Sequence, residues 1–168
     1  VVGAGGTDAP AHIGARSGHT AVALGDKVVV FGGMQGGGRD PGDTQVYILD
    51  TDEDAFLPYS WSRVKASGPA PSARQGHCAW LNGTRMYVFG GVLGVLNILQ
   101  RDLEDVTVPF YNDLYAIDLA CVLDGSCVGD DANTTAVWQD LTQTVIANAG
   151  ANALPSPRAW HTCSVVGD

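Results

Sequence analysis

An arginine and a histidine occur together three times at one spacing. The segments Arg16-Ser-Gly-His19, Arg74-Gln-Gly-His77 and Arg158-Ala-Trp-His161 all follow the pattern Arg-x-x-His. Imidazole nitrogens bind zinc and copper, and guanidinium groups bind carboxylates. Because residues that recur with a repeat are usually structural, we expect His19, His77 and His161 to be structural, with no metal. The arginines have two interpretations, bonds at a repeat junction or contacts with an acidic ligand, and we keep them as candidate binding residues.

A second group of polar residues has the composition of a calcium loop. Residues 50–54 read Asp-Thr-Asp-Glu-Asp, so oxygen ligands occur at alternate positions. An EF-hand loop also needs glycine at its sixth position and glutamate at its twelfth, where this chain has Ala55 and Trp61. We therefore expect a solvated turn.

Other chemistries lack their usual residues. The chain has no Gly-x-Ser-x-Gly, His-Glu-x-x-His or phosphate-binding loop, so we expect neither catalysis nor a cofactor. Its net charge is −9, with no basic cluster, which disfavours binding to nucleic acid. The longest uncharged apolar stretch, residues 90–99, is too short to enter and span a bilayer.

The elements that position the Arg-x-x-His motifs also repeat. After each of the first two motifs, an apolar strand is predicted (residues 19–24 and 77–81), followed by a tight turn. The second strand then ends in paired glycines. These pairs are Gly32 and Gly33 in the first copy and Gly90 and Gly91 in the second.

The second half of each copy has its own aromatic residues. A third strand carries Tyr47 or Tyr115, and a fourth carries Trp61 or Trp138. A proline-containing linker then leads to the next Arg-x-x-His. Together these features resemble kelch repeats over residues 10–168.

The resemblance implies an all-β fold made of kelch-type β-propeller blades, each a four-stranded antiparallel sheet. Residues 1–15 would be the tail of a preceding connection, 16–73 the first blade and 74–157 the second, with long loops at 92–112 and 119–137. Residues 158–168 would form the first strand of a third blade. Since propellers have about four to eight blades, we expect a fragment of a complete propeller, whose remaining blades would cover the exposed sheet faces.

Two features bear on the compartment. Cys121 and Cys127 flank a turn and are a candidate disulfide, and Asn82 and Asn133 begin Asn-x-Thr glycosylation sequons. These residues favour an extracellular or cell-surface protein. The absence of a signal peptide in residues 1–20 favours the alternative, a cytoplasmic or ciliary protein.

The long loop of the second copy contains a candidate contact surface. Val95, Leu96, Leu99 and Leu103 fall on one face of a short amphipathic helix. This stripe either packs on its own blade or forms a docking ridge for a protein.

The predicted function is a non-catalytic protein–protein interaction or scaffold module of a larger extracellular or surface protein. Its partners would be other proteins or the remaining blades of the same polypeptide. One alternative is an intracellular kelch adaptor or a cytoskeletal or ciliary scaffold. The other is the propeller portion of a galactose-oxidase-like or lyase enzyme whose catalytic residues lie elsewhere.

Overall fold

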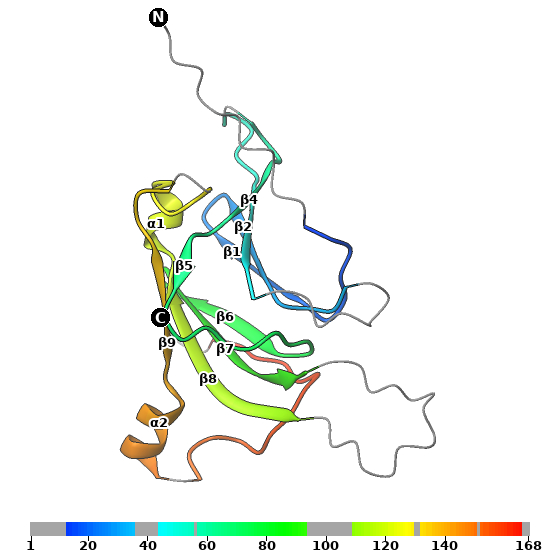
Figure 1. Cartoon of the computed structure of the whole chain (residues 1–168), viewed down its shortest axis with the longest axis vertical. Coiled ribbons are helices and arrows are strands. Elements are labelled where there is room, and N and C mark those ends of the chain that lie inside the picture. Colours follow the sequence, from blue (N-terminus) through cyan, green and yellow to red (C-terminus); the bar gives the residue numbers. More distant parts are fainter. Residues whose placement is uncertain are drawn as a thin grey trace, which may run out of the picture.

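The structure, a computed structural model, describes residues 13–35, 44–55, 57–93, 109–129, 132–150 and 152–165. Within these ranges the chain is mostly β, in two sheets that lie side by side (Figure 1). The first sheet contains β1 (Thr20–Leu24), β2 (Lys27–Phe31), β3 (Val46–Asp50) and β4 (Trp61–Arg63). The second contains β5 (Ala66–Ser67), β6 (Cys78–Asn82), β7 (Arg85–Val92), β8 (Phe110–Asp118) and β9 (Ala136–Asp140).

The first sheet is a simple meander. Its strands are hydrogen-bonded in chain order, β1-β2-β3-β4, and every neighbouring pair is antiparallel. Val29 in β2 lies opposite Val22 in β1 and Ile48 in β3. This arrangement confirms the predicted fold class, antiparallel blades of the kelch type.

The second sheet repeats the meander and adds one strand. Strands β6 to β9 are antiparallel in chain order, and β5 pairs in parallel with the outer strand β9, with Ala66 opposite Ala136. The predicted blade had four strands, so β5 is a difference. It arises because the linker leaving β4 runs along the edge of the next sheet and satisfies part of that edge's hydrogen bonds.

Two helices occur where the sequence predicted only loops. Helix α1 (Ala120–Leu123) follows β8, and α2 (Thr142–Ala149) follows β9. In both cases an aspartate two residues earlier accepts a hydrogen bond from the first helical amide, Asp118 for Ala120 and Asp140 for Thr142, each at 2.9 Å. In the part of the chain that the structure describes, no helix combines the length and apolar character needed to cross a membrane.

The hydrophobic core lies between the two sheets rather than within either one. Phe31 of β2 and Trp138 of β9 meet with their ring centroids 5.3 Å apart, and both are almost completely buried. The surrounding core residues come from both sheets and from the loop that contains α1: Val29, Val46, Ile48, Met86, Val88, Ile117, Leu119, Val122 and Cys127. Each sheet therefore depends on its neighbour to bury its apolar face.

Neighbouring residues of β9 provide a test of this shared core. Trp138 is 1% exposed, whereas Val137, which points to the other side of the strand, is 50% exposed. We expect Trp138→Ala to lower the free energy of unfolding by about 3–5 kcal/mol, because it leaves a cavity between the sheets. Val137→Ala should change it by less than about 1 kcal/mol. Urea titration of the intact protein measures both values, and equal effects would contradict the position of the core.

Candidate functional site

Arg74 is the centre of a buried polar cluster. Its side chain has no exposed surface. Its Nε donates to the carbonyl of Ser72 at 3.0 Å, and its Nη1 donates to the carbonyl of Gly90 at 2.9 Å. The two carboxylate oxygens of Asp113 accept from Nη1 and Nη2 at 2.6 and 2.9 Å, and the guanidinium lies 4.3 Å from the ring centre of Tyr111. Arg74 is therefore held by its own repeat, a geometry that favours the structural interpretation over contact with a ligand.

The other two arginines make part of the same arrangement. Arg16 donates from Nε to the carbonyl of Gly14 at 3.3 Å and from Nη1 to the carbonyl of Gly32 at 2.9 Å. Arg158 donates from Nε to the carbonyl of Ser156 at 3.0 Å and is exposed. In all three copies the guanidinium thus binds the carbonyl two residues before it. Contact between Arg158 and an acidic ligand stays a prediction.

The repeated tyrosines lie beneath the arginines. The Arg16 guanidinium is 4.9 Å from the ring centre of Tyr47, and that of Arg74 is 5.6 Å from Tyr115. Trp138 is buried between the sheets, whereas its counterpart Trp61 is half-buried. The tyrosines therefore pack against the arginine side chains, and Trp138 packs in the hydrophobic core.

The paired glycines join one repeat to the next. The amide of Gly33 donates to the carbonyl of Arg74, and the amide of Gly91 donates to the carbonyl of Arg158, both at 2.8 Å. A Cβ atom on Gly32 would lie 2.8 Å from the Arg74 carbonyl oxygen, which is closer than real Cβ contacts come. The paired glycines thus mark the place where the backbones of successive repeats come into direct contact.

His77 is a buried, neutral residue at the contact between the first and second repeats, which we call the first junction; the second junction is the contact between the second repeat and the segment that contains Arg158 and His161. Its side chain is 4% exposed, its Nε2 lies 2.8 Å from the hydroxyl of Thr20, and its ring meets Phe31 edge-on at 5.5 Å. Burial, with a further contribution from the positive charge of Arg74, lowers the pKa of His77 to about 3. The imidazole is therefore uncharged at neutral pH and joins β1 to the second repeat.

His161 occupies the equivalent place at the second junction but has different neighbours. Its ring meets Phe89 edge-on at 5.4 Å, as His77 meets Phe31. Both of its ring nitrogens are buried without a hydrogen-bond partner among the described residues. Burial lowers its pKa, and the nearby Arg158 adds to the effect. Within the described ranges, His19, His77 and His161 do not form a group that could hold a metal ion.

The third residue of each Arg-x-x-His motif forms a chain of backbone hydrogen bonds across the repeats. The amide of Gly76 donates to the carbonyl of Gly18 at 2.9 Å, and the amide of Trp160 donates to the carbonyl of Gly76 at 2.7 Å. All three have left-handed backbones, with φ of 69°, 62° and 61°. Glycine adopts this conformation freely, whereas tryptophan does so at a cost.

Trp160 covers the two glycines and remains 65% exposed. Its ring atoms lie 2.9 Å from the Cβ position of Gly18 and 2.9 Å from that of Gly76. The sequence interpretation did not single out this residue. The signal was available, because Trp160 replaces the glycine found at the same position of the first two motifs.

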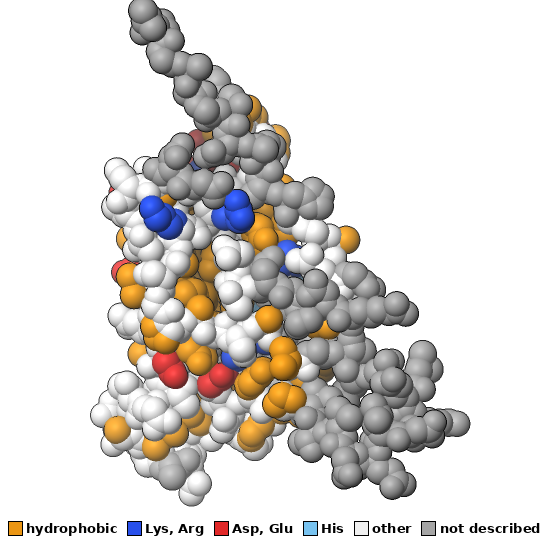
Figure 2. Space-filling model, in the orientation of Figure 1, with side chains coloured by type: hydrophobic (Ala, Val, Ile, Leu, Met, Phe, Trp, Pro, Cys, Tyr) orange, Lys and Arg blue, Asp and Glu red, His pale blue; other side chains and the backbone are white. Residues whose placement is uncertain are grey.

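We call the end of the sheets that carries Trp160, the end of β7 and the start of β8 the loop face. Leu93 and Phe110, which flank the β7–β8 connection here, are 37% and 43% exposed. Figure 2 shows hydrophobic side chains gathered on the surface next to the residues drawn in grey. The predicted docking ridge, Val95, Leu96, Leu99 and Leu103, lies outside the described residues.

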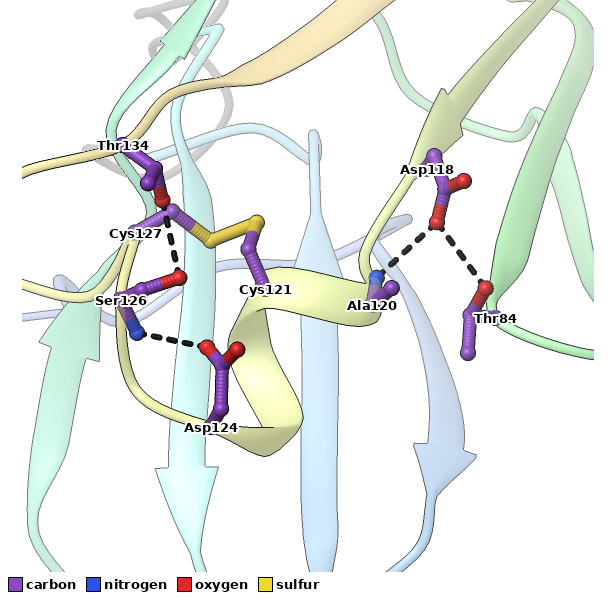
Figure 3. Close-up of a disulfide and its surroundings, with 8 residues drawn as sticks. All are labelled: Thr84, Asp118, Ala120, Cys121, Asp124, Ser126, Cys127 and Thr134. Atoms are coloured by element: carbon purple, nitrogen blue, oxygen red, sulfur yellow. Dashed lines mark hydrogen bonds between the residues drawn. A yellow bond between two sulfur atoms is a disulfide. The ribbon is translucent and has the colours of Figure 1, made fainter.

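The opposite face is built around α1 (Figure 3). Cys121 and Cys127 are joined by a disulfide, with Cα atoms 5.4 Å apart, so the structure contains the predicted pair. Asp118 accepts hydrogen bonds from the Ala120 amide and the Thr84 hydroxyl, both at 2.9 Å. These contacts fix the helix against the β6–β7 turn.

The sequons and the acidic turn also lie on the opposite face. Asn82 and Asn133 are exposed, and their glycosylation stays a prediction. In the acidic turn, Asp50 accepts from the amide of Asp52 at 3.0 Å and from the Lys27 ammonium at 2.8 Å. This is the hydrogen bonding of an ordinary turn at the end of β3.

A second disulfide, which the sequence interpretation missed, joins Cys78 of β6 to Cys163, with Cα atoms 5.7 Å apart. It connects the edge strand β6 of the second sheet to the segment that follows His161. The two residues are 85 positions apart, so their spacing gave no signal. Alignment of the repeats places Cys78 at the position of Thr20. Only this alignment indicates that Cys78 and Cys163 lie where two successive repeats meet.

Comparisons with known proteins agree with the repeat pattern. The family model described as the KLHDC2/KLHL20/DRC7 kelch-repeats domain matches residues 7–168. The chain is 33% identical over 103 residues to the Rab9 effector protein with kelch motifs of Gallus gallus, covering 61% of this chain and 23% of that protein. It is 30% identical over 154 residues to Tip elongation aberrant protein 1 of Schizosaccharomyces pombe, covering 91% and 10%.

A third relative is the Rho GTPase-activating protein gacHH of Dictyostelium discoideum, 34% identical over 84 residues, which cover 49% of this chain and 5% of that protein. The chain therefore spans less than a quarter of the length of each of these three relatives.

The buried arginine cluster gives a stability prediction. Arg74→Gln leaves the Asp113 carboxylate without its bidentate partner, and we expect the free energy of unfolding to fall by about 3–5 kcal/mol. Arg85→Gln is the matched control, because Arg85 is half-exposed and hydrogen-bonds to the exposed side chain of Gln139. Its effect should stay below about 1 kcal/mol. Urea titration measures both, and a small effect at Arg74 would contradict its structural role.

The lowered pKa of His77 predicts acid sensitivity. The unfolded imidazole binds a proton below about pH 6.5, whereas the folded one resists protonation down to about pH 3. The contribution of neutral His77 to the free energy of unfolding is therefore fully present above pH 6.5. It falls as the pH drops from about 6.5 towards 3, by up to about 1.4 kcal/mol per pH unit. Urea titrations at several pH values give the free energy of unfolding as a function of pH, and its slope against pH should be shallower for His77→Gln than for the wild type. Equal slopes for the two proteins would contradict a buried neutral histidine.

Proposed function

This chain belongs to the kelch-repeat family, and from that premise we propose that it is a non-catalytic protein-binding module that contacts its partner through the loop face. Its sheets are blades of a kelch-type β-propeller. No described feature of the loop face has the form of a catalytic constellation, and the Arg74 guanidinium and the amides of Gly33 and Gly91 there make structural hydrogen bonds.

The observation that carries the proposal is the exposure of Trp160. A left-handed backbone costs a residue other than glycine roughly 1–2 kcal/mol, and strained residues cluster at binding sites. The large indole of Trp160 is exposed, so it contributes little stabilising burial of apolar surface. Tryptophan is among the residues most enriched at the energetic centres of interfaces. A partner that covers the indole would offset its backbone cost.

The surroundings of Trp160 support the same surface. Leu93 and Phe110 add exposed apolar area at the β7–β8 connection. On the opposite face, the Cys121–Cys127 disulfide and the bonds of Asp118 hold a short helix in place. Connections between strands commonly carry binding residues on a rigid scaffold, and Leu93 and Phe110 stand at the two ends of such a connection on the loop face.

We further propose that the protein acts inside cells, as an adaptor or scaffold. This is the alternative to the extracellular interpretation based on the cysteines and sequons. Its support comes from the names of the relatives, one a Rab9 effector and another a Rho GTPase-activating protein. Those names make a small GTPase, or a protein that regulates one, the first class of partner to test.

A pair of matched variants tests the loop face. Trp160→Gly restores the residue type of the first two motifs, so we expect the fold to persist, with a change in unfolding free energy of less than about 2 kcal/mol. Tyr59→Gly is the control, because Tyr59 is also an exposed aromatic residue with a left-handed backbone (59% exposed, φ 57°) but lies between β3 and β4 on the opposite face. Partner affinity should fall more than about tenfold for Trp160→Gly and stay unchanged for Tyr59→Gly.

The measurement has two stages. Affinity capture from cells with the intact protein as bait, read by quantitative mass spectrometry, identifies proteins lost with Trp160→Gly but kept with Tyr59→Gly. Direct binding is then measured with each purified protein, including GTPases loaded with GDP or a GTP analogue. Proteins that are lost only with Tyr59→Gly would place the interface on the opposite face. A bait that captures no protein specifically would contradict the binding function itself.

A further inference from the structure

The junction between β6 and the segment after Trp160 contains a cluster of metal-binding atoms. The sulfur atoms of Cys78 and Cys163 and a ring nitrogen of His161 all lie within 4.8 Å of one another. Cys78 is 5% exposed, and the other two residues are half-buried. Among the described residues, this is the only group of three histidine, cysteine or acidic side chains close enough to share one ion.

The first junction shows what is unusual about the second. There the hydroxyl of Thr20 lies 2.8 Å from Nε2 of His77, so that one of the two ring nitrogens has a partner. At the second junction Cys78 stands in place of Thr20, and the buried nitrogens of His161 have no hydrogen-bond partner among the described residues. A buried polar group without a partner is rare in native structures, and an ion that satisfies it is one explanation for its presence.

We propose that Cys78, His161 and Cys163 form a binding site for Zn²⁺ when the two cysteines are reduced. Two thiolates and one imidazole are the ligands that zinc prefers, and three protein ligands leave a fourth position for water or another donor. Bond lengths of about 2.0–2.3 Å place zinc ligands about 3.3–3.8 Å apart. The observed cluster therefore needs only small side-chain movements to surround an ion.

The bond between the two sulfurs defines the other state of the site. Reduction by a phosphine breaks this bond: the sulfurs gain two electrons and two protons, and the phosphine leaves as its oxide with an oxygen from water. Zinc then displaces the two thiol protons as it binds. The same atoms can thus tie the two repeats together covalently or through a metal ion, but not through both at once.

The repeats themselves supply conservative substitutions for the test. Thr20 occupies the position of Cys78 in the first copy, and Ala21 and Ala79 occupy the position of Cys163 in the first and second copies. The double variant Cys78→Thr/Cys163→Ala therefore uses residues that the fold accommodates elsewhere. The matched control is Cys121→Ser/Cys127→Ser, which removes the other cysteine pair, since that pair belongs to no group of three possible ligands among the described residues.

The experiment uses the intact protein, reduced with a phosphine, incubated with zinc chloride and desalted. Mass spectrometry of the metal content should show about one zinc ion more per molecule in the wild type than in Cys78→Thr/Cys163→Ala. The Cys121→Ser/Cys127→Ser variant should retain the wild-type content. Cobalt(II) substituted for zinc should give a thiolate-to-metal charge-transfer absorption in the wild type that the Cys78→Thr/Cys163→Ala variant lacks.

His161→Phe separates the imidazole from the cysteines and keeps an aromatic ring against Phe89. Competition with a chromophoric chelator should show zinc bound at least about tenfold more weakly than in the wild type. Equal zinc content in the wild type and Cys78→Thr/Cys163→Ala would overturn the site, as would an absent thiolate absorption. If the double variant does not fold, the His161→Phe affinity decides, and an unchanged affinity rejects the proposal.

Discussion

The contact on which the rest of the structure depends is the approach of each Gly-Gly pair to the arginine of the next repeat. The carbonyl of Arg74 accepts a hydrogen bond from Gly33 of the preceding repeat, while its guanidinium binds the carbonyl of Gly90 in its own repeat. One residue thus links two successive glycine pairs. No side chain larger than hydrogen fits at Gly32 or Gly33 without moving backbone or an imidazole. The spacing between sheets is therefore set by backbone hydrogen bonds, and the side chains fill the space that remains.

The position of the core follows from that spacing. The sheets are joined backbone to backbone beside the glycine pairs, and large residues such as Phe31 and Trp138 fill the space between the sheet faces. The core belongs to the junction and not to one repeat. Stability in such a chain is a sum of contributions from neighbouring pairs. The Arg74–Asp113 pair and the neutral His77 lie beside the glycine pairs, where Asp113 binds the Arg74 guanidinium and Thr20 binds Nε2 of His77.

The repeat pattern was sufficient to predict the strands and their antiparallel pairing, because alternation, turn residues and paired glycines act locally. It could not predict β5, which forms only because a linker happens to lie along the edge of the next sheet. The helices α1 and α2 have weak apolar periodicity, and their starts depend on Asp118 and Asp140 at the ends of strands. The Cys78–Cys163 bond depends on two strands brought together by the repeat geometry. The burial of Arg74 required the carboxylate of Asp113, whose place in the first copy is taken by Gln45.

Recurrence and departure from recurrence carry different information in this chain. Residues that recur, such as the arginines and paired glycines, make the same contacts at each junction, and their function is the geometry itself. Departures are informative because the scaffold around them is constant. Trp160 adopts the backbone of Gly18 and Gly76 despite its side chain, and Cys78 removes the hydroxyl that an equivalent buried histidine uses. Both departures concern the second junction. The left-handed backbone of Trp160 has a cost that glycine avoids in the first two motifs, and a partner at the indole would offset that cost. The buried nitrogens of His161 lack the hydroxyl partner that Thr20 gives to His77, and an ion held by the reduced cysteines would supply a partner.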